Sequence, residues 1–74
     1  MNNRKDQREK SMQDILEATL ALVRKNGFVA TNTIDIAKKA GVSNGLIFSH
    51  FKTRDGLIQA VISDFESRYI KKFI

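Results

Sequence analysis

The sequence predicts a small all-α domain, and three observations support this. The 74-residue chain has no proline, only four glycines and many good helix formers, so long helices meet few interruptions. Its apolar residues recur at spacings of three and four, which is the period of an amphipathic helix. Short polar segments with Gly, Ser, Thr or Asn separate these stretches, as helix caps do. A chain of this length forms one domain.

The first helix is expected over about residues 11–26, with a start that the pattern leaves open. Its apolar stripe consists of Met12, Ile15, Leu16, Thr19, Leu22 and Val23. Gly27 follows two basic residues and is expected to end the helix in the left-handed conformation. The preceding residues 1–10 are nearly all polar, and we expect them to form a basic, partly disordered N-terminal arm.

Two short helices are expected next, joined by the three residues 41–43. The first covers residues 33–40 with Asn32 as its N-cap, and the second covers residues 44–50 with Ser43 as its N-cap. Two short helices joined by a three-residue turn that contains glycine are typical of a helix-turn-helix motif.

The connection between these two helices, with the residues that pack against it, forms a corner, and each residue type in it has a physical reason. Ala37 is small because the second helix crosses over it, and Gly41 supplies a backbone conformation that a Cβ atom would penalise. Val42 and Ile47 are expected to fill the angle between the helices and to close a small core against the first helix. Ser43 caps the second helix and leaves first-turn N–H groups pointing outward, ready for a phosphate.

The last helix is expected to start at Arg54 after the cap residue Thr53. Gly56 lies in its first turn, where it costs some helix propensity. Its apolar residues again recur at three and four, at Leu57, Ile58, Val61, Ile62, Phe65, Tyr69 and Phe73. No stop signal follows, so we expect this helix to lead out of the domain.

Charge and composition limit the possible functions. Thirteen Lys and Arg against eight Asp and Glu give a net charge of +5, which favours a polyanionic partner. Without cysteine and with a single histidine, the chain offers neither a disulfide framework nor a zinc site. No apolar run approaches ~20 residues, so no membrane span or signal peptide is expected. No nucleophile–base pair or phosphate loop stands out, so we expect neither an enzyme nor a cofactor.

Two kinds of partner fit the basic charge. One is duplex DNA, and the other is an acidic partner or an anionic membrane surface that meets a basic helical face. The Gly41 turn and the small Ala37 argue against the second, because a lipid-binding helix needs no tight three-helix core.

Over residues 11 to 65 the sequence resembles the N-terminal DNA-binding domain of the TetR (tetracycline repressor) family of bacterial transcriptional regulators. The resemblance rests on an ordered set of motifs: Ile15-Leu16-Glu17-Ala18, Gly27-Phe28, Thr31-Asn32-Thr33, Asp35-Ile36-Ala37, Ala40-Gly41-Val42-Ser43, Gly45, Ile47-Phe48, His50-Phe51-Lys52 and Leu57. It implies a homeodomain-like three-helix head over residues 11–53 and a fourth helix, residues 54–74, that begins a C-terminal ligand-binding and dimerisation domain. It also implies a cytoplasmic, nucleoid-associated homodimer that represses transcription, binds a palindromic DNA operator and releases it when a small-molecule effector binds.

The resemblance also implies which residues contact DNA. Asn44, Gly45 and Leu46 would face base edges, with Asn44 able to pair bidentately with adenine. The remaining contacts would be to phosphates, from Phe48, Ser49, His50, Lys52 and Arg54 and from the cap residues Asn32, Thr33 and Ser43. Two positions depart from the family pattern: Phe48 lacks the hydroxyl of the usual tyrosine, and Ile34 replaces a polar residue that reads bases in many members.

Overall fold

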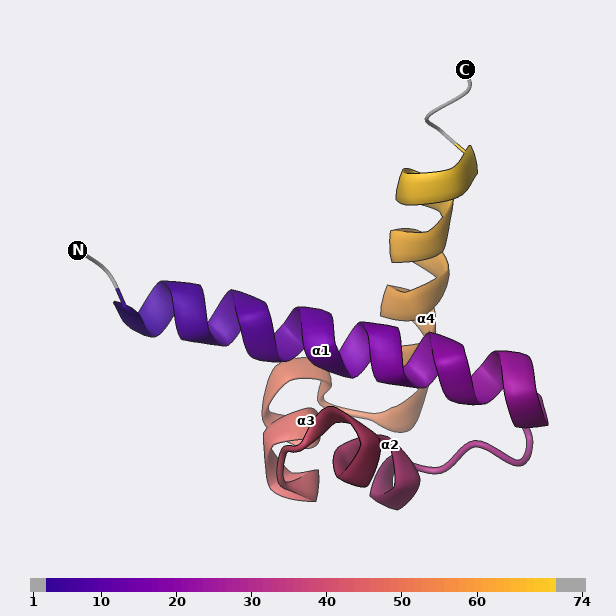
Figure 1. The fold of residues 1–74 in the computed structure, drawn as a ribbon, viewed down its shortest axis with the longest axis horizontal. Helices are drawn as coiled ribbons and strands as arrows, with labels where there is room; N and C mark the ends of the chain where they lie inside the picture. Colours follow the sequence, from indigo (N-terminus) through magenta and orange to yellow (C-terminus); the bar gives the residue numbers. More distant parts are fainter. Residues whose placement is uncertain (1–2, 71–74) are drawn as a thin grey trace.

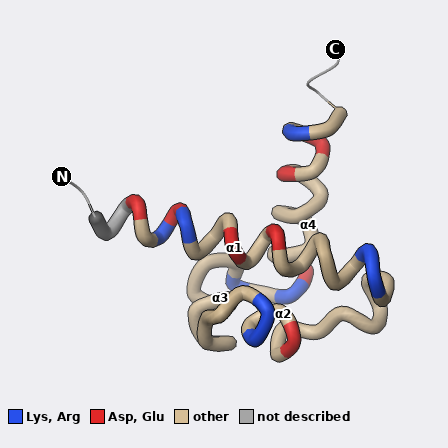
Figure 2. The backbone as a smooth tube through the Cα atoms, in the orientation of Figure 1, with Lys and Arg blue, Asp and Glu red and all other residues tan. Residues whose placement is uncertain are grey.

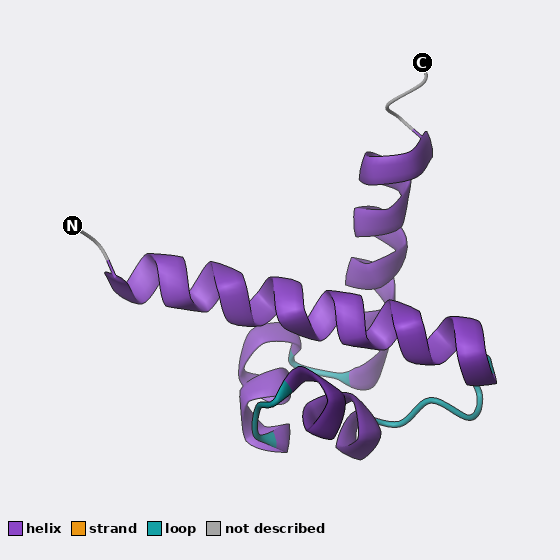
Figure 3. Cartoon of the chain, viewed as in Figure 1, coloured by secondary structure: helices purple, strands orange, loops and turns teal. Residues whose placement is uncertain are grey.

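The computed structural model describes residues 3–70, which form helices joined by short connections and no strand (Figure 3). The elements are α1 (Asn3–Asn26), α2 (Thr33–Ala40), α3 (Asn44–Phe51), α4 (Arg54–Phe65) and the π-helical turn η1 (Glu66–Ile70). Helices α2 and α3 lie on one side of the long α1, and α4 leads away from this head (Figure 1). The predicted all-α head with a fourth, departing helix is therefore confirmed.

The first helix is longer than expected, because α1 begins at Asn3 and includes the basic segment predicted to be a partly disordered arm. Residues 3–10 contain mainly Arg, Lys, Gln and Glu, which are good helix formers, and nothing in them breaks a helix. Asp6 lies in the first turn, where the helix dipole favours an acid, and Lys10 pairs with Asp14 one turn later at 3.1 Å. The polar composition of this segment suggested partial disorder, whereas its residues have high intrinsic helix propensity.

The core contains side chains from all four α-helices. The buried apolar residues are Ile15 and Ala18 of α1, Ile36 and Ala37 of α2, Ile47 and Phe51 of α3, and Leu57 and Val61 of α4. Thr19 is buried with them, and its hydroxyl donates to the Ile15 carbonyl at 2.7 Å, which satisfies the polar group. The predicted packing of Ala37, Val42 and Ile47 in the corner is confirmed.

The corner between α2 and α3 is a helix stop of the Schellman type. Gly41 has φ of 74° and its N–H bonds to the Lys38 carbonyl at 3.3 Å, while the Val42 N–H bonds to the Ala37 carbonyl at 3.0 Å. These bonds satisfy the last carbonyls of α2 and place Val42 over Ala37. The chain then enters α3 through the Ser43 cap, in a new direction.

The connection between α3 and α4 is tighter than the sequence indicates. Lys52 has φ of 69° and ψ of −49°, and the Thr53 N–H donates to the Phe51 carbonyl at 2.8 Å. This geometry is a γ-turn with a non-glycine residue at its centre, which is a strained conformation. The turn brings the Phe51 carbonyl against the first turn of α4, where a Cβ on Gly56 would lie within 3.0 Å of its oxygen. Gly56 is therefore required for close approach of two backbones.

The last helix changes its winding after Phe65. The predicted apolar stripe assumed one α-helix, but residues 66–70 form the π-helical turn η1, whose wider turn shifts the register of the side chains. The Phe65 and Tyr69 rings still contact each other, with centroids 4.9 Å apart, whereas Tyr69 and Ile70 are each 49% exposed. Phe73 and the other residues after Ile70 lie outside the described residues.

We expect Gly56→Ala to destabilise the domain by about 1–3 kcal/mol, because the new Cβ forces apart the γ-turn and the start of α4. Gly45→Ala is the matched control: its Cβ would meet only Ser43 Oγ, at 3.9 Å, so stability should stay the same or rise slightly. Urea unfolding followed by circular dichroism measures both. Equal stability of the two variants would contradict this description of the α3–α4 connection.

Candidate nucleic-acid interface

Helix α3 has one buried face and one exposed face. Ile47, 1% exposed, and Phe51 anchor it in the core, while Gly45 and Ser49 lie on the opposite side and are exposed. Asn44 is exposed at the N-terminal end of the helix, as its first residue. Leu46 is half-buried at the edge towards α1, and Phe48 is 38% exposed. The structure thus brings the three predicted base-reading residues, Asn44, Gly45 and Leu46, to the first turn of a helix whose outer side is open.

Ser43 caps this helix as predicted. Its hydroxyl accepts a hydrogen bond from the Leu46 N–H at 3.1 Å. The N–H groups of the preceding residues Asn44 and Gly45 have no intrahelical acceptor, because a helix leaves its first donors free. Oriented N–H groups at a helix start are suited to an anion.

Helix α3 itself carries no Lys, Arg, Asp or Glu (Figure 2). Side-chain positive charge at pH 7 must therefore come from neighbouring elements. Lys52 lies directly after α3 and is exposed, and among the described residues its side chain forms no hydrogen bond or ion pair. Lys38 and Lys39, in the last turn of α2, are also exposed.

The side chain of Asn32, the N-cap of α2, is hydrogen-bonded within its own helical turn. The Asn32 side chain accepts from the Asp35 N–H at 2.9 Å and donates to the Asp35 carboxylate at 3.0 Å, which confirms the predicted cap. The carboxylate adds negative charge beside the α2 N-terminus, which weakens its attraction for a phosphate. Thr33 is half-buried in the same turn.

Arg54 contacts the protein itself. Its Nη2 donates to the Phe28 carbonyl at 2.5 Å and to the Thr31 carbonyl at 3.1 Å, so the guanidinium holds the α1–α2 connection against the start of α4. Thr31 is buried there, with its hydroxyl on the Gly27 carbonyl at 2.7 Å. The structure gives Arg54 a positioning role through Nη2, and the phosphate contact expected of this exposed residue stays a prediction.

His50 faces α1, and its Nε2 lies 2.9 Å from the Ser11 hydroxyl. That hydroxyl has one hydrogen and donates it to the Arg8 carbonyl at 3.1 Å, so the network assigns the donor role to His50 Nε2. Burial, and secondly the nearby Arg8 charge, lower the pKa of His50 below its usual value of 6.5. The imidazole is consequently neutral at pH 7 in the free protein.

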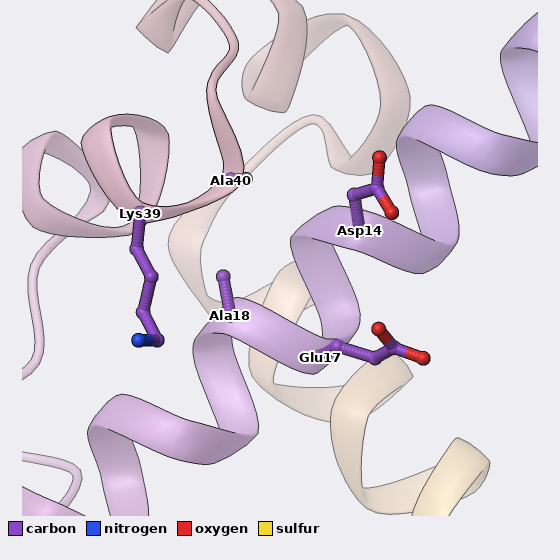
Figure 4. Close-up of a pocket in the computed structure, with 5 residues that line it drawn as sticks. All are labelled: Asp14, Glu17, Ala18, Lys39 and Ala40. Atoms are coloured by element: carbon purple, nitrogen blue, oxygen red, sulfur yellow. The ribbon is translucent and has the colours of Figure 1, made fainter.

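A separate hollow of about 270 Å³ lies between α1 and α2 (Figure 4). Asp14, Glu17 and Ala18 of α1 line one side, and Lys39 and Ala40 of α2 line the other. The Lys39 side chain extends away from both carboxylates, and no ion pair spans the hollow. The carboxylates of half-buried Asp14 and exposed Glu17 make this hollow unsuitable for DNA.

The comparisons with known proteins agree with this geometry. The family model described as "Bacterial regulatory proteins, tetR family" matches residues 15–61, which is more than half of the chain. The chain belongs to the TetR family of bacterial regulatory proteins. Members of the family are DNA-binding transcription regulators, so the matched segment is a DNA-binding domain and not an enzyme.

The chain is similar to several curated TetR-type regulators. It is 45% identical over 53 residues, 72% of this chain and 28% of the relative, to the uncharacterized HTH-type transcriptional regulator YvkB of Bacillus subtilis (strain 168). It is 42% identical over 50 residues to the HTH-type transcriptional regulator BetI of Yersinia pestis (strain Pestoides F), covering 68% of this chain and 25% of the relative. The chain thus spans about a quarter of the length of these relatives. No solved structure matches.

Two further findings bear on this TetR-family domain. None of its helices within residues 3–70 has the length and apolar character needed to cross a bilayer. In the same part of the chain, His, Asp and Glu residues nowhere gather into a group of three that could hold a metal ion.

We expect Arg54→Gln to lower the free energy of unfolding by about 1 kcal/mol, because glutamine cannot hold both loop carbonyls. Lys52→Gln, at a neighbouring exposed cation without a partner among the described residues, should change stability by no more than ~0.5 kcal/mol. Urea unfolding measures both. If the two variants were equally stable, the hydrogen bonds from Arg54 to the two loop carbonyls would not stabilise the fold, and its positioning role would be contradicted.

Proposed function

We propose that this chain is the DNA-reading head of a TetR-type repressor, and that α3 enters the major groove of duplex DNA. One observation carries the proposal: α3 is anchored by Ile47 and Phe51, while the side that bears Gly45 and Ser49 and the N-terminal residue Asn44 are exposed. A half-exposed helix held by a compact corner is the element that helix-turn-helix proteins insert into a groove.

In this proposal the first turn of α3 reads bases. Asn44 pairs bidentately with an adenine, Leu46 contacts a thymine methyl group, and Gly45 allows the backbone to approach the duplex. A duplex engaged by these residues brings its phosphates to the surfaces that flank α3. Phosphate contacts from Ser43, Phe48, Ser49, His50, Lys52, Asn32 and Thr33 then set register without reading sequence. Arg54 adds a further phosphate contact and also fixes the turn that precedes α2.

For the whole protein we propose a homodimer in the bacterial cytoplasm, associated with the nucleoid. Its two heads occupy successive major grooves about 34–36 Å apart on a palindromic operator. Residues 54–74 begin a further domain that dimerises and binds a small-molecule effector. An apolar groove of about 410 Å³ between α1 and α4, lined by Val23, Phe28 and Phe65 among others, supports this as the surface on which that domain packs.

Salt-titrated binding to duplex DNA and to anionic vesicles tests the proposal against the alternative of an acidic partner or membrane surface. The proposal expects DNA binding with a steep salt dependence and a preferred sequence that selection from a random pool recovers. Binding to vesicles without preference for any duplex would contradict it.

We expect Asn44→Ala to weaken binding to the selected duplex by about 1–3 kcal/mol, because a base contact is lost. Binding to a random duplex should stay nearly unchanged. Lys52→Ala should weaken binding to both duplexes about equally and reduce the slope of log affinity against log salt concentration by about 1. Lys25→Ala is the control, since Lys25 lies in the last turn of α1, about 20 Å along the helix from Ser11. Fluorescence anisotropy measures all three variants, and equal loss on both duplexes for Asn44→Ala would remove its base-reading role.

A further inference from the structure

An open cleft of about 350 Å³ lies between the N-terminal half of α1 and α3. Gln7, Arg8 and Ser11 line it from α1, and Leu46 and His50 line it from α3. The Ser11–His50 hydrogen bond of 2.9 Å ties the two walls together. The cleft exists because α1 begins at Asn3, so its first turns extend past the point where α3 packs.

The cleft lies at the edge of the surface assigned to base reading. Leu46 and His50 are one helical turn apart, so they share one flank of α3, next to the exposed side that bears Gly45 and Ser49. A helix in the major groove has a phosphate backbone on each side of it. The α1 wall of the cleft is therefore placed where one of these backbones would run.

The cleft also has the charge that a phosphate requires. Arg8 is exposed, and among the described residues it forms no ion pair, whereas Lys10 pairs with Asp14 and Arg68 with Asp64. Among the residues that the structure describes, no carboxylate lines the cleft, in contrast to the hollow between α1 and α2. Gln7 adds an amide donor, and His50 adds a second cation when it is protonated.

We propose that this cleft holds one DNA backbone phosphate, with Arg8 as its principal cation and His50 as a second, proton-dependent one. The inference rests on the proposed DNA-binding function and extends the interface from α3 to the first helix. It concerns affinity and register only, since a phosphate contact carries no sequence information.

The ionisation of His50 supports the assignment. Among the charged groups on α1, α2 and α4 that the structure describes, Arg8 is the one close enough to lower the pKa of His50, together with burial. A phosphate in the cleft would offset the Arg8 charge and favour the imidazolium, so the pKa of His50 would be higher in the complex than in the free protein. DNA affinity should then rise as the pH falls through the range between these two values and stay constant well above it.

Binding of the 74-residue chain to a short random-sequence DNA duplex, between about 50 and 200 mM salt, tests the contact. We expect Arg8→Gln to weaken binding about fivefold at low salt and to reduce the salt slope by about 1. Arg24→Gln, the same substitution in the last turn of the same helix, is the control and should change neither. Circular dichroism confirms that both variants fold.

A pH series separates the part played by His50, which is the only histidine of the chain. The wild-type chain should bind the duplex more tightly at about pH 6 than at about pH 8, and His50→Gln should remove most of this difference. NMR titration of the His50 ring should show its pKa raised by the duplex, but not by inorganic phosphate at matched ionic strength.

The outcomes distinguish the inference from the function on which it depends. If the wild-type chain binds the duplex but Arg8→Gln and Arg24→Gln lose affinity equally, the cleft is not a phosphate site. A pKa of His50 raised as much by inorganic phosphate would overturn the assignment to DNA. If the wild-type chain binds no duplex, the proposed function fails and the phosphate site fails with it.

Discussion

The reversal of the backbone at Gly41 sets the direction of α3 and, through it, the packing of the core. Its positive φ ends α2 and redirects the chain, and the small Ala37 lets the next helix cross closely. Ile47 and Phe51 can then reach the core formed by α1 and α4. Because these two residues anchor one side of α3, its other side is left for a partner.

The sequence predicts most of this arrangement, because the corner, the caps and the core follow local rules. Asn32, Ser43 and Thr53 cap their helices as their residue types indicate, and Gly27 and Gly41 both have positive φ. Tertiary features were missed. The γ-turn at Lys52, the need for Gly56 and the two carbonyls held by Arg54 depend on backbones that meet only in the fold. The π-helical turn after Phe65 has no evident sequence signal.

The candidate interface shows the same difference between features that follow local sequence rules and features that depend on the tertiary fold. The exposure of Gly45 and Ser49 follows from the helical period once Ile47 and Phe51 are assigned to the core, whereas Asn44 is exposed because it is the first residue of α3. The contact between His50 and Ser11 depends on how far α1 extends and where α3 crosses it, which the polar residues 1–10 did not reveal. The sequence contained one signal for this wall of the site, because Arg8 and Ser11 are three residues apart and so share one face of a continuous helix. Because α3 carries no Lys or Arg, the permanent positive charge beside it comes from neighbouring elements.

In the proposed complex the open side of α3 and the surfaces flanking it meet DNA. Amide chemical-shift mapping of the 74-residue chain with a duplex selected from a random pool tests it most directly. The largest shifts should cluster on residues 43–50, at Lys52 and around Arg8, while the shifts of the groove between α1 and α4 stay unchanged. Shifts concentrated in that groove, with α3 unaffected, would contradict it.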